Sequence, residues 1–166
     1  MFILYCCAMP ELDPLDAAIL ALVQQNNRLT NVQIAEEVGL SATAVHRRLR
    51  RLRAAGVIEA DVAVVSPEAV GRGMTAIVEV ELEREAPDLI DAFKTRMLSA
   101  PEVMQCYYVT GSADFVLIVT SHNLKDYEAL TQRLLFANPN VKRFRTSVVM
   151  ERFKVGLAVP LATASD

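Results

Sequence analysis

The sequence predicts an α+β fold, with an N-terminal winged helix-turn-helix domain followed by a C-terminal ferredoxin-like βαββαβ domain. The first part rests on residues 30–58, which show the pattern of two short helices around a glycine turn, with five arginines in the second helix. The second part rests on residues 73–153, where strand-like alternation and helix-like spacing follow one another in the order β-α-β-β-α-β. With 166 residues, 52% of them hydrophobic, the chain can build two small cores.

The first helix is predicted to begin at Pro14. Asp13 stands at the N-cap position before it, and Asp16 lies in the first turn, where a carboxylate complements the helix dipole. Apolar residues then recur at helical spacing as far as about residue 25: Leu15, Ile19, Leu22 and Val23. We expect this helix to be the first of three in a small helical unit.

The second helix is predicted to start with a capping box. Thr30 and Gln33 have the capping-box spacing, and Ile34 and Val38 give the helix a buried side. Gly39 then ends the helix and forms the turn.

The third helix follows at once, over residues 42–54. Ser41 has the side chain to cap it, and Val45, Leu49 and Leu52 form one narrow apolar stripe. The stripe is expected to face the core of the helical unit, and Gly56 ends the helix.

The rest of this third helix is basic, which makes it the candidate DNA-binding element. No acidic residue occurs between 38 and 58, and five of the six basic side chains in residues 11–60 lie within 47–53. Such a run is often only a solvated face, but a solvated helix usually pairs its charges, and a helix whose arginines lack a partner needs an external polyanion. We therefore predict double-stranded DNA as the partner, with the helix in the major groove.

The predicted DNA-binding residues lie on two sides of the helix. Opposite the stripe project Thr43, His46, Arg47 and Arg50, whereas Arg48, Arg51 and Arg53 flank it and can reach phosphates; Ser41 at the cap completes the set.

Residues 57–65 are rich in β-branched side chains and predict an extended strand or connector that serves as hinge and wing. The breaker residues Ser66, Pro67, Gly71 and Gly73 mark the domain boundary. The predicted divisions are a mobile leader (1–11), the helix-turn-helix domain (12–56), the connecting strand and hinge (57–72), the ferredoxin-like domain (73–154) and a C-terminal tail (155–166).

The second domain begins with strict alternation over residues 75–83, typical of a strand covered on one side. Pro87 and Asp88 suit the first turn of a helix that runs to about residue 99. Two strands follow, at about 103–109 and 113–120, joined by a short turn as a hairpin.

Asn123 is predicted to cap the second helix of this domain, which ends before Pro139, and the last strand spans residues 141–153. Both helices then cover one face of a four-stranded antiparallel sheet. The other face carries residues such as Ile77, Tyr107 and Val149, so we expect a second copy to cover it in a homodimer.

Other classes of protein are disfavoured. Cys6, Cys7 and Cys106 are too few for a disulfide framework, which favours the reducing cytoplasm. The apolar opening is too short for a signal peptide or a membrane span, and translation from Met9 is as compatible with the pattern as translation from Met1. No nucleophile arrangement or metal-ligand spacing occurs, so we expect no catalysis, no metal, no cofactor and no membrane partner.

From residue 12 to residue 154 the chain resembles the Lrp/AsnC, or feast/famine, family of bacterial and archaeal transcription regulators. LDPLDAAIL resembles the first helix of the family, and NVQIAEEVGLSATAVHRRLRRLRAAGVI resembles its helix-turn-helix. PEVMQCYYVTGSADFVLIV resembles the hairpin of the amino-acid-response domain, and RFRTSVVMERFK resembles its last strand. All four segments occur in the family order.

The resemblance implies a DNA-binding dimer that assembles further, often into an octamer, with a small effector, usually an amino acid, bound between dimers. It places the effector cleft beside the loop from Val109 to Asp114, where backbone N–H groups near Gly111 and the Asp114 carboxylate suit an amino acid. The implied effector-binding residues are Tyr108, Thr110, Gly111, Asp114 and Ser147. Ser112 and Ala113 differ from the Asp-Tyr pair common in the family, which leaves the ligand open, and Asp114 also suits a purely turn-capping role.

Two other interpretations remain. A siroheme-decarboxylase-like enzyme has a related architecture. However, only one histidine, His122, lies in the C-terminal half of the chain, and the arginine-rich helix would have no task in such an enzyme. The second interpretation is an assembly whose helix-turn-helix is vestigial. The intact cap, turn and basic face of the helix-turn-helix count against it.

Overall fold

The structure is a computed structural model that describes residues 11–161. The predicted mobile leader before residue 11, both candidate start methionines, Cys6, Cys7 and the last five residues of the predicted tail lie outside the described residues. By its contacts the chain divides into two compact units, one of Met1–Ala63 with Val155–Asp166 and one of Val64–Lys154. Each unit is described here by itself.

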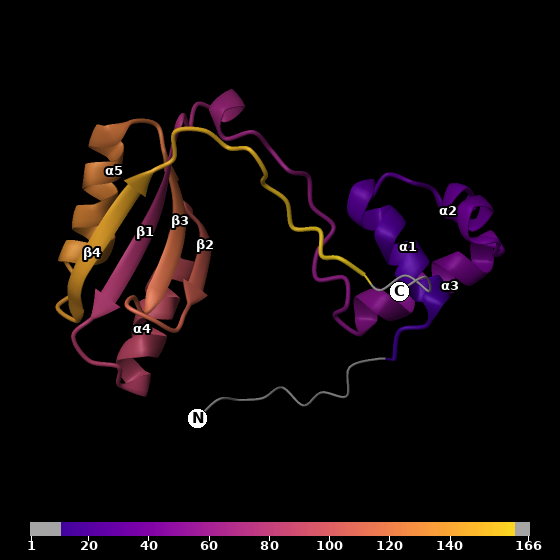
Figure 1. The fold of residues 1–166 in the computed structure, drawn as a ribbon, viewed down its shortest axis with the longest axis horizontal. Helices are drawn as coiled ribbons and strands as arrows, with labels where there is room; N and C mark the ends of the chain where they lie inside the picture. Colours follow the sequence, from indigo (N-terminus) through magenta and orange to yellow (C-terminus); the bar gives the residue numbers. More distant parts are fainter. Residues whose placement is uncertain (1–10, 162–166) are drawn as a thin grey trace. The chain divides into compact units, whose positions relative to one another are not determined.

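The N-terminal unit contains the three predicted helices: α1 (Pro14–Gln25), α2 (Asn31–Val38) and α3 (Ala42–Ala54) (Figure 1). Asp13 caps α1 and Thr30 caps α2, each in a reciprocal capping box. The core between the helices is formed by side chains that are at most 6% exposed: Ile19, Ile34, Ala35, Val45 and Leu49. The apolar stripe of α3 therefore faces the core, as predicted.

Residues 57–65 form an irregular connector, so of the two predicted alternatives, strand or connector, the strand is wrong. Val62, Val64 and Val65 are 59–84% exposed, and no strand within residues 11–161 pairs with them. β-branched residues favour an extended backbone, but a strand also needs a neighbour for its hydrogen bonds, and the part of the chain that the structure describes supplies none. The predicted wing is likewise not formed as a strand.

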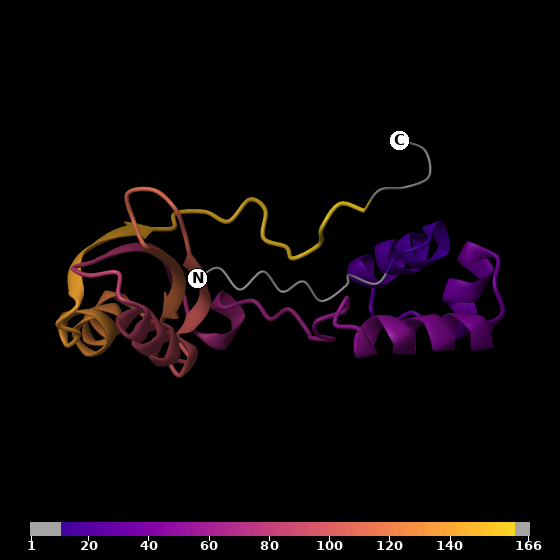
Figure 2. The same ribbon diagram turned by 90° about the horizontal axis from the view of Figure 1, so that it is seen from below.

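The C-terminal unit has the predicted ferredoxin-like order. It comprises β1 (Met74–Leu82), α4 (Pro87–Leu98), β2 (Val103–Tyr108), β3 (Phe115–Ser121), α5 (Leu124–Thr131), a π-helical turn η2 (Gln132–Phe136) and β4 (Val141–Val148), with a short 3₁₀ turn η1 (Glu68–Val70) before β1. The sheet order is β2-β3-β1-β4, all antiparallel. Figure 2 shows α4 and α5 on the same face of this sheet.

The last strand is shorter than predicted: β4 ends at Val148, not at residue 153. Val148 pairs with Ala76, and one further hydrogen bond joins the Val149 N–H to the Thr75 carbonyl. Because β1 begins at Met74, the chain beyond this point has no strand to pair with.

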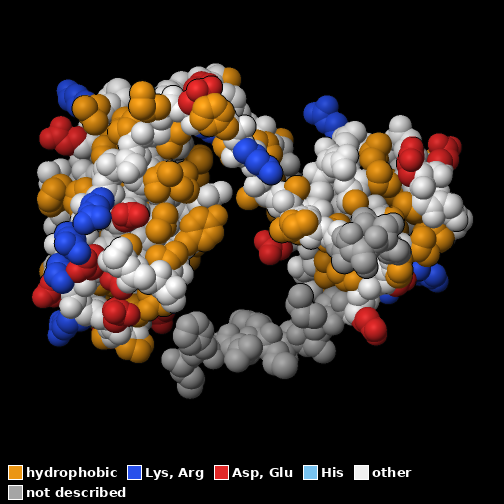
Figure 3. Space-filling view, in the orientation of Figure 1, with side chains coloured by type: hydrophobic (Ala, Val, Ile, Leu, Met, Phe, Trp, Pro, Cys, Tyr) orange, Lys and Arg blue, Asp and Glu red, His pale blue; other side chains and the backbone are white. Residues whose placement is uncertain are grey.

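Alternation along β1 places Ala76, Val78, Val80 and Leu82 in the core, at most 5% exposed, under α4 and α5. The opposite face is open. It carries Ile77, which is 38% exposed, and Tyr107, which is 49% exposed. In Figure 3 hydrophobic side chains gather on this face over β3 and β2, and charged ones gather over β4.

Candidate nucleic-acid interface and effector loop

The turn between α2 and α3 fixes where α3 begins. Gly39 has φ 68°, the left-handed conformation that glycine adopts at little cost, and its N–H bonds the Ala35 carbonyl. Leu40 donates to the same carbonyl at 3.0 Å. Ser41 then caps α3, its hydroxyl accepting from the Ala44 N–H at 3.2 Å. The predicted helix-turn-helix is thus formed in full.

The outer side of α3 carries the predicted base-reading residues. Thr43, His46, Arg47 and Arg50 are all exposed, on the side opposite the buried stripe. His46 Nδ1 lies 3.4 Å from Asn31 Nδ2, and Arg47 and Arg50 form no ion pair with any residue between 11 and 161. Two guanidinium groups on this side are therefore available to a ligand.

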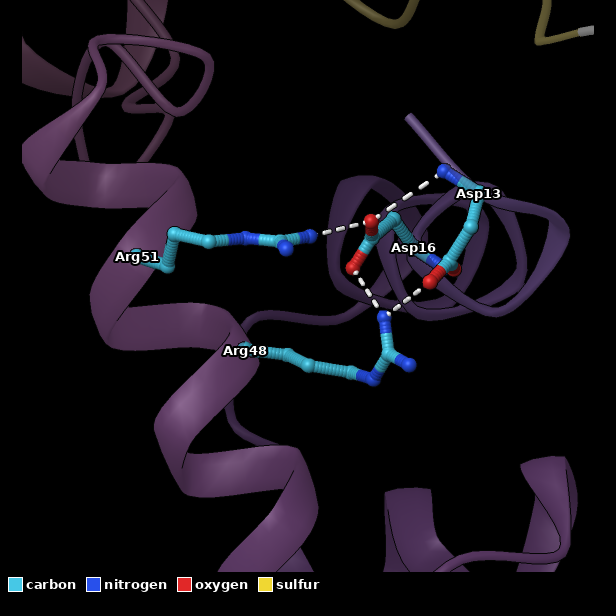
Figure 4. Close-up of polar contacts among 4 residues, drawn as sticks. All are labelled: Asp13, Asp16, Arg48 and Arg51. Atoms are coloured by element: carbon cyan, nitrogen blue, oxygen red, sulfur yellow. Dashed lines mark hydrogen bonds and ion pairs between the residues drawn. The ribbon is translucent and has the colours of Figure 1, made fainter. Parts of the chain in front are cut away.

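Two other arginines of α3 form ion pairs with acidic residues of the same unit (Figure 4). Arg48 Nη1 lies 2.6 Å from Asp13 Oδ2 and 2.8 Å from Asp16 Oδ1. Arg51 pairs with the other oxygen of Asp16, whose side chain is fully buried. The Arg48 side chain is 20% exposed and that of Arg51 is 51% exposed. The Arg48 guanidinium lowers the pKa of the Asp13 carboxyl, and Asp13 in turn raises the pKa of Arg48.

Arg53 has a partner in the connector. Its Nε lies 2.7 Å from Asp61 Oδ2 and its Nη2 lies 3.2 Å from Asp61 Oδ1, with both side chains about two-fifths exposed. This pair lowers the pKa of Asp61 and raises that of Arg53.

The prediction that these arginines lack acidic partners is thus wrong for Arg48, Arg51 and Arg53. The partners come from α1 and from the connector, so charge spacing along α3 alone could not reveal them. Sequence reasoning missed Asp61 as the partner of Arg53. It also missed Asp13 and Asp16 as the partners of Arg48 and Arg51. The capping and dipole roles of these two aspartates already explained their positions, and only the packing of α1 against α3 gives them a second one.

The predicted effector loop is closed by its own backbone. The Val109 N–H bonds the Asp114 carbonyl, and the Asp114 N–H bonds the Val80 carbonyl, both at 2.9 Å. Asp114 Oδ2 accepts from the Leu82 N–H at 2.6 Å, which ties the loop to β1. Gly111 lies at the exposed tip with φ 125°, in a region that favours glycine.

The other predicted effector residues are not all brought together. Thr110 is exposed in the same loop, next to Gly111. Tyr108 lies on the helix side of the sheet, where its ring is 5.0 Å from that of Phe115 and its hydroxyl donates to Glu85 at 3.3 Å. Ser147 is exposed on β4 opposite Ile77, two strands away from β3. Within one chain these five residues do not line a single pocket.

On the open face of the sheet, the surface beside the loop is only slightly hollowed, whereas a hollow of about 230 Å³ on the helix side is lined by Tyr108 and Phe115 together with residues of α4. A cavity of about 30 Å³ is lined by Ser112, Ala113, Glu79, Glu81, Arg143, Phe144 and Arg145. It has room for about one water molecule and not for an amino acid.

The described residues contain no group of three or more side chains that could hold a metal ion. None of the described helices is long and apolar enough to cross a membrane.

Two family models match the chain. The model of the Lrp/AsnC ligand binding domain matches residues 75–159, and a model of a winged helix-turn-helix DNA-binding domain matches residues 12–59. The two models together span both units of the structure.

Relatives of known name match along most of the chain. It is 55% identical over 151 residues to an uncharacterized HTH-type transcriptional regulator, y4tD, of Sinorhizobium fredii. The match covers 91% of this chain and 89% of the relative. It is 34% identical over 144 residues to the leucine-responsive regulatory protein of Escherichia coli K12, covering 87% and 88%. Its structure resembles the transcriptional regulator NMB0573 of Neisseria meningitidis in complex with L-Met, with a TM-score of 0.84 and 32% identity over 90% of this chain and 97% of that one.

Proposed function

Because this chain belongs to the Lrp/AsnC family of DNA-binding transcriptional regulators, we propose that it binds specific DNA sites through the exposed side of α3. The single observation that carries this proposal is the group of exposed polar side chains opposite the core stripe: Thr43, His46, Arg47 and Arg50. An arginine on the exposed side of such a helix can contact guanine bidentately in the major groove. We assign base contacts to these four and phosphate contacts to Ser41 and Arg53.

A homodimer is the proposed binding unit, because the open face of the sheet carries Ile77 and Tyr107 and a second copy would cover both. Two α3 helices related by a twofold axis would then contact successive half-sites on one side of the duplex. Assembly of dimers into an octamer, as the family resemblance implies, is part of the proposal. We also propose that the protein is located in the cytoplasm, where bacterial and archaeal DNA lies.

The proposed effector is an amino acid bound at the loop of Thr110, Gly111 and Asp114, between dimers. Two relatives support it: one is named leucine-responsive, and the other is a complex with L-Met. Asp114 supports it chemically, since only its Oδ2 has a hydrogen bond among residues 11–161 and Oδ1 remains for an α-ammonium group. The small cavity beside the loop fits a site that another dimer completes.

The effector is proposed to act by assembly. A ligand that favours one oligomer changes operator affinity only if that oligomer holds the α3 helices at a different spacing. Typical coupling energies of about 1 to 3 kcal/mol correspond to changes of about 5 to 150-fold in affinity. Linkage requires operator DNA to change the effector affinity by the same factor.

Selection of genomic fragments by the purified protein, with and without a panel of amino acids, tests both parts. We expect a small set of enriched fragments that share a twofold-symmetric motif, and we expect one or a few amino acids to change the enrichment. Enrichment no greater than that of bulk DNA would contradict the proposal. The relatives named above are transcriptional regulators, which favours this function over the decarboxylase alternative.

A further inference from the structure

We propose that Asp13 and Asp16 withhold Arg48 and Arg51 from DNA, so that these two arginines hold α3 in place and do not bind phosphate. The inference rests on the proposed DNA-binding function of α3 and adds which of its cations are available to the duplex. It begins from the contacts in Figure 4.

Arg48 is the most firmly held of the arginines. It bonds two carboxylates at once, at 2.6 and 2.8 Å, and its side chain is 20% exposed. Both carboxylates contact the same atom, Nη1, and their negative charge opposes a phosphate that approaches the other N–H groups of this guanidinium. Turning the guanidinium toward a phosphate would separate it from both carboxylates. One of them, Asp16, has a fully buried side chain and could not regain its lost partner from water.

Arg51 is more exposed, at 51%, but it is the second cation on the same buried carboxylate. If Arg51 bound a phosphate instead, Asp16 would keep only Arg48 as a charged partner. The Oδ2 atom of Asp16 would then lose its charged donor. Removing one partner from a buried ion pair is strongly destabilising, because the remaining charge stays desolvated. A solvated phosphate offers no comparable gain, so Arg51 stays with Asp16.

The pair of Arg53 and Asp61 behaves differently, because each side chain is about two-fifths exposed. A surface pair of this kind contributes only about 0 to 1 kcal/mol. A phosphate can therefore replace Asp61, and Arg53 remains available to DNA. Of the five arginines in α3, we infer that Arg47, Arg50 and Arg53 neutralise phosphates or contact bases, while Arg48 and Arg51 do not.

This division favours specificity. Backbone contacts supply nearly all of the affinity for non-specific DNA, which competes with the operator throughout a genome. Two internal carboxylates lower that affinity without removing any side chain from the base-reading side of α3.

Two arginines of α3 that each form an ion pair in the free protein give a matched test, Arg51→Gln and Arg53→Gln in the full chain. Each variant loses one charge from the same helix, and thermal melting checks that each is folded. Binding to a duplex of random sequence is measured over a range of salt concentrations. Each lost phosphate contact lowers the slope of log affinity against log salt by about 0.9. We expect that loss for Arg53→Gln, for each protomer bound, and an unchanged slope for Arg51→Gln.

An equal loss of slope in both variants would overturn the inference while leaving the DNA-binding face intact. No change in either variant would show that α3 places neither arginine on a phosphate, and the inference would fall with the proposed phosphate contact of Arg53.

Arg48 is tested in the unaltered protein, because its replacement would disturb the buried pair. Phenylglyoxal modification followed by mass spectrometry reports which guanidinium groups are accessible. We expect Arg50 to react quickly in the free protein and to be protected by DNA, and Arg48 to react slowly in both states. Rapid reaction of Arg48 that DNA suppresses would contradict the inference.

Discussion

Asp13 has two roles in the structure: its carboxylate caps α1 and also accepts a hydrogen bond from Arg48. The guanidinium holds the pKa of the carboxyl below its ordinary value of 3.8. Because the pKa is lower in the folded state, the pair stabilises the fold fully above pH 3.8. This contribution is lost as the pH falls through the folded pKa.

The first prediction concerns Asp13→Asn, which keeps a capping side chain but cannot ionise. The free energy of unfolding of this variant should fall less steeply than that of the unaltered protein when the pH is lowered from neutrality to below 3.8. Urea midpoints at each pH measure this. Asp61 and Glu81 also have lowered pKa values, owing to Arg53 and to Lys142, and both proteins share this background. Parallel curves for the two proteins would contradict the pairing of Asp13 with Arg48.

Asp114 is the second residue whose role can be tested directly. Asp114→Asn keeps an acceptor for the Leu82 N–H but removes the charge, whereas Asp114→Ala removes both. If Oδ1 binds an α-ammonium group, the Asn variant should stay folded and bind the amino acid more weakly by about 1.5 to 3 kcal/mol. Calorimetry against the effector found by selection gives the comparison. Unchanged binding in the Asn variant would show that Asp114 is only a turn residue.

The predicted DNA-binding residues differ in how far the sequence could place them. Periodicity correctly put Thr43, His46, Arg47 and Arg50 opposite the stripe, because it depends only on the 100° step of a helix. Periodicity also put Arg48 beside the stripe, but whether Arg48 is available to DNA depends on the acidic residues at the start of α1. Ion pairs between helices are set by packing, which one-dimensional spacing does not contain.

At the scale of elements, the turn of the helix-turn-helix depends on one backbone conformation. Gly39 has φ 68° and no heavy atom lies within 4 Å of where a Cβ would stand, so any cost of a side chain there is conformational. We expect Gly39→Ala to destabilise the protein by about 1 to 2 kcal/mol. Gly73→Ala is the control, because that position is equally open and has no positive φ. Denaturant unfolding of both variants measures the difference, and equal costs would contradict the account of this turn.

Helices and paired strands were predicted closely because their signals are local. The caps at Thr30, Ser41 and Asn123 and the alternation along β1 all appear in the structure. The two errors, at residues 57–65 and 149–153, share a cause. Both segments have strand-like composition, but a strand forms only where a neighbour is in reach, and that is a property of the whole sheet.

At the scale of the whole molecule, the C-terminal unit has its own core and an open sheet face. Its first residues are anchored to it, since Arg72 donates to the Thr120 carbonyl at 3.1 Å and His122 Nδ1 lies 2.8 Å from the Gly71 carbonyl. His122 is therefore exposed, but its ring is fixed by this contact. A fragment that begins at residue 73 would lose these anchors.

We therefore predict that Val64–Lys154 alone folds into a dimer or a larger ring. The reason is the exposed Ile77 and Tyr107 on the open face, which a second copy would cover. Light scattering measures the mass of the fragment in solution. A well-folded monomer at micromolar concentration would contradict the proposed interface.

Recognition of a DNA sequence by the outer side of α3 can be tested by a gel-shift titration of one variant. The double variant Arg47→Ala, Arg50→Ala is compared with the unaltered protein on a selected genomic fragment and on a scrambled duplex of the same length. If these arginines contact bases, each should account for about 1 to 3 kcal/mol of the preference for the selected fragment. We expect the unaltered protein to prefer that fragment and the variant to lose most of this preference. An undiminished preference in the folded variant would contradict this role of α3.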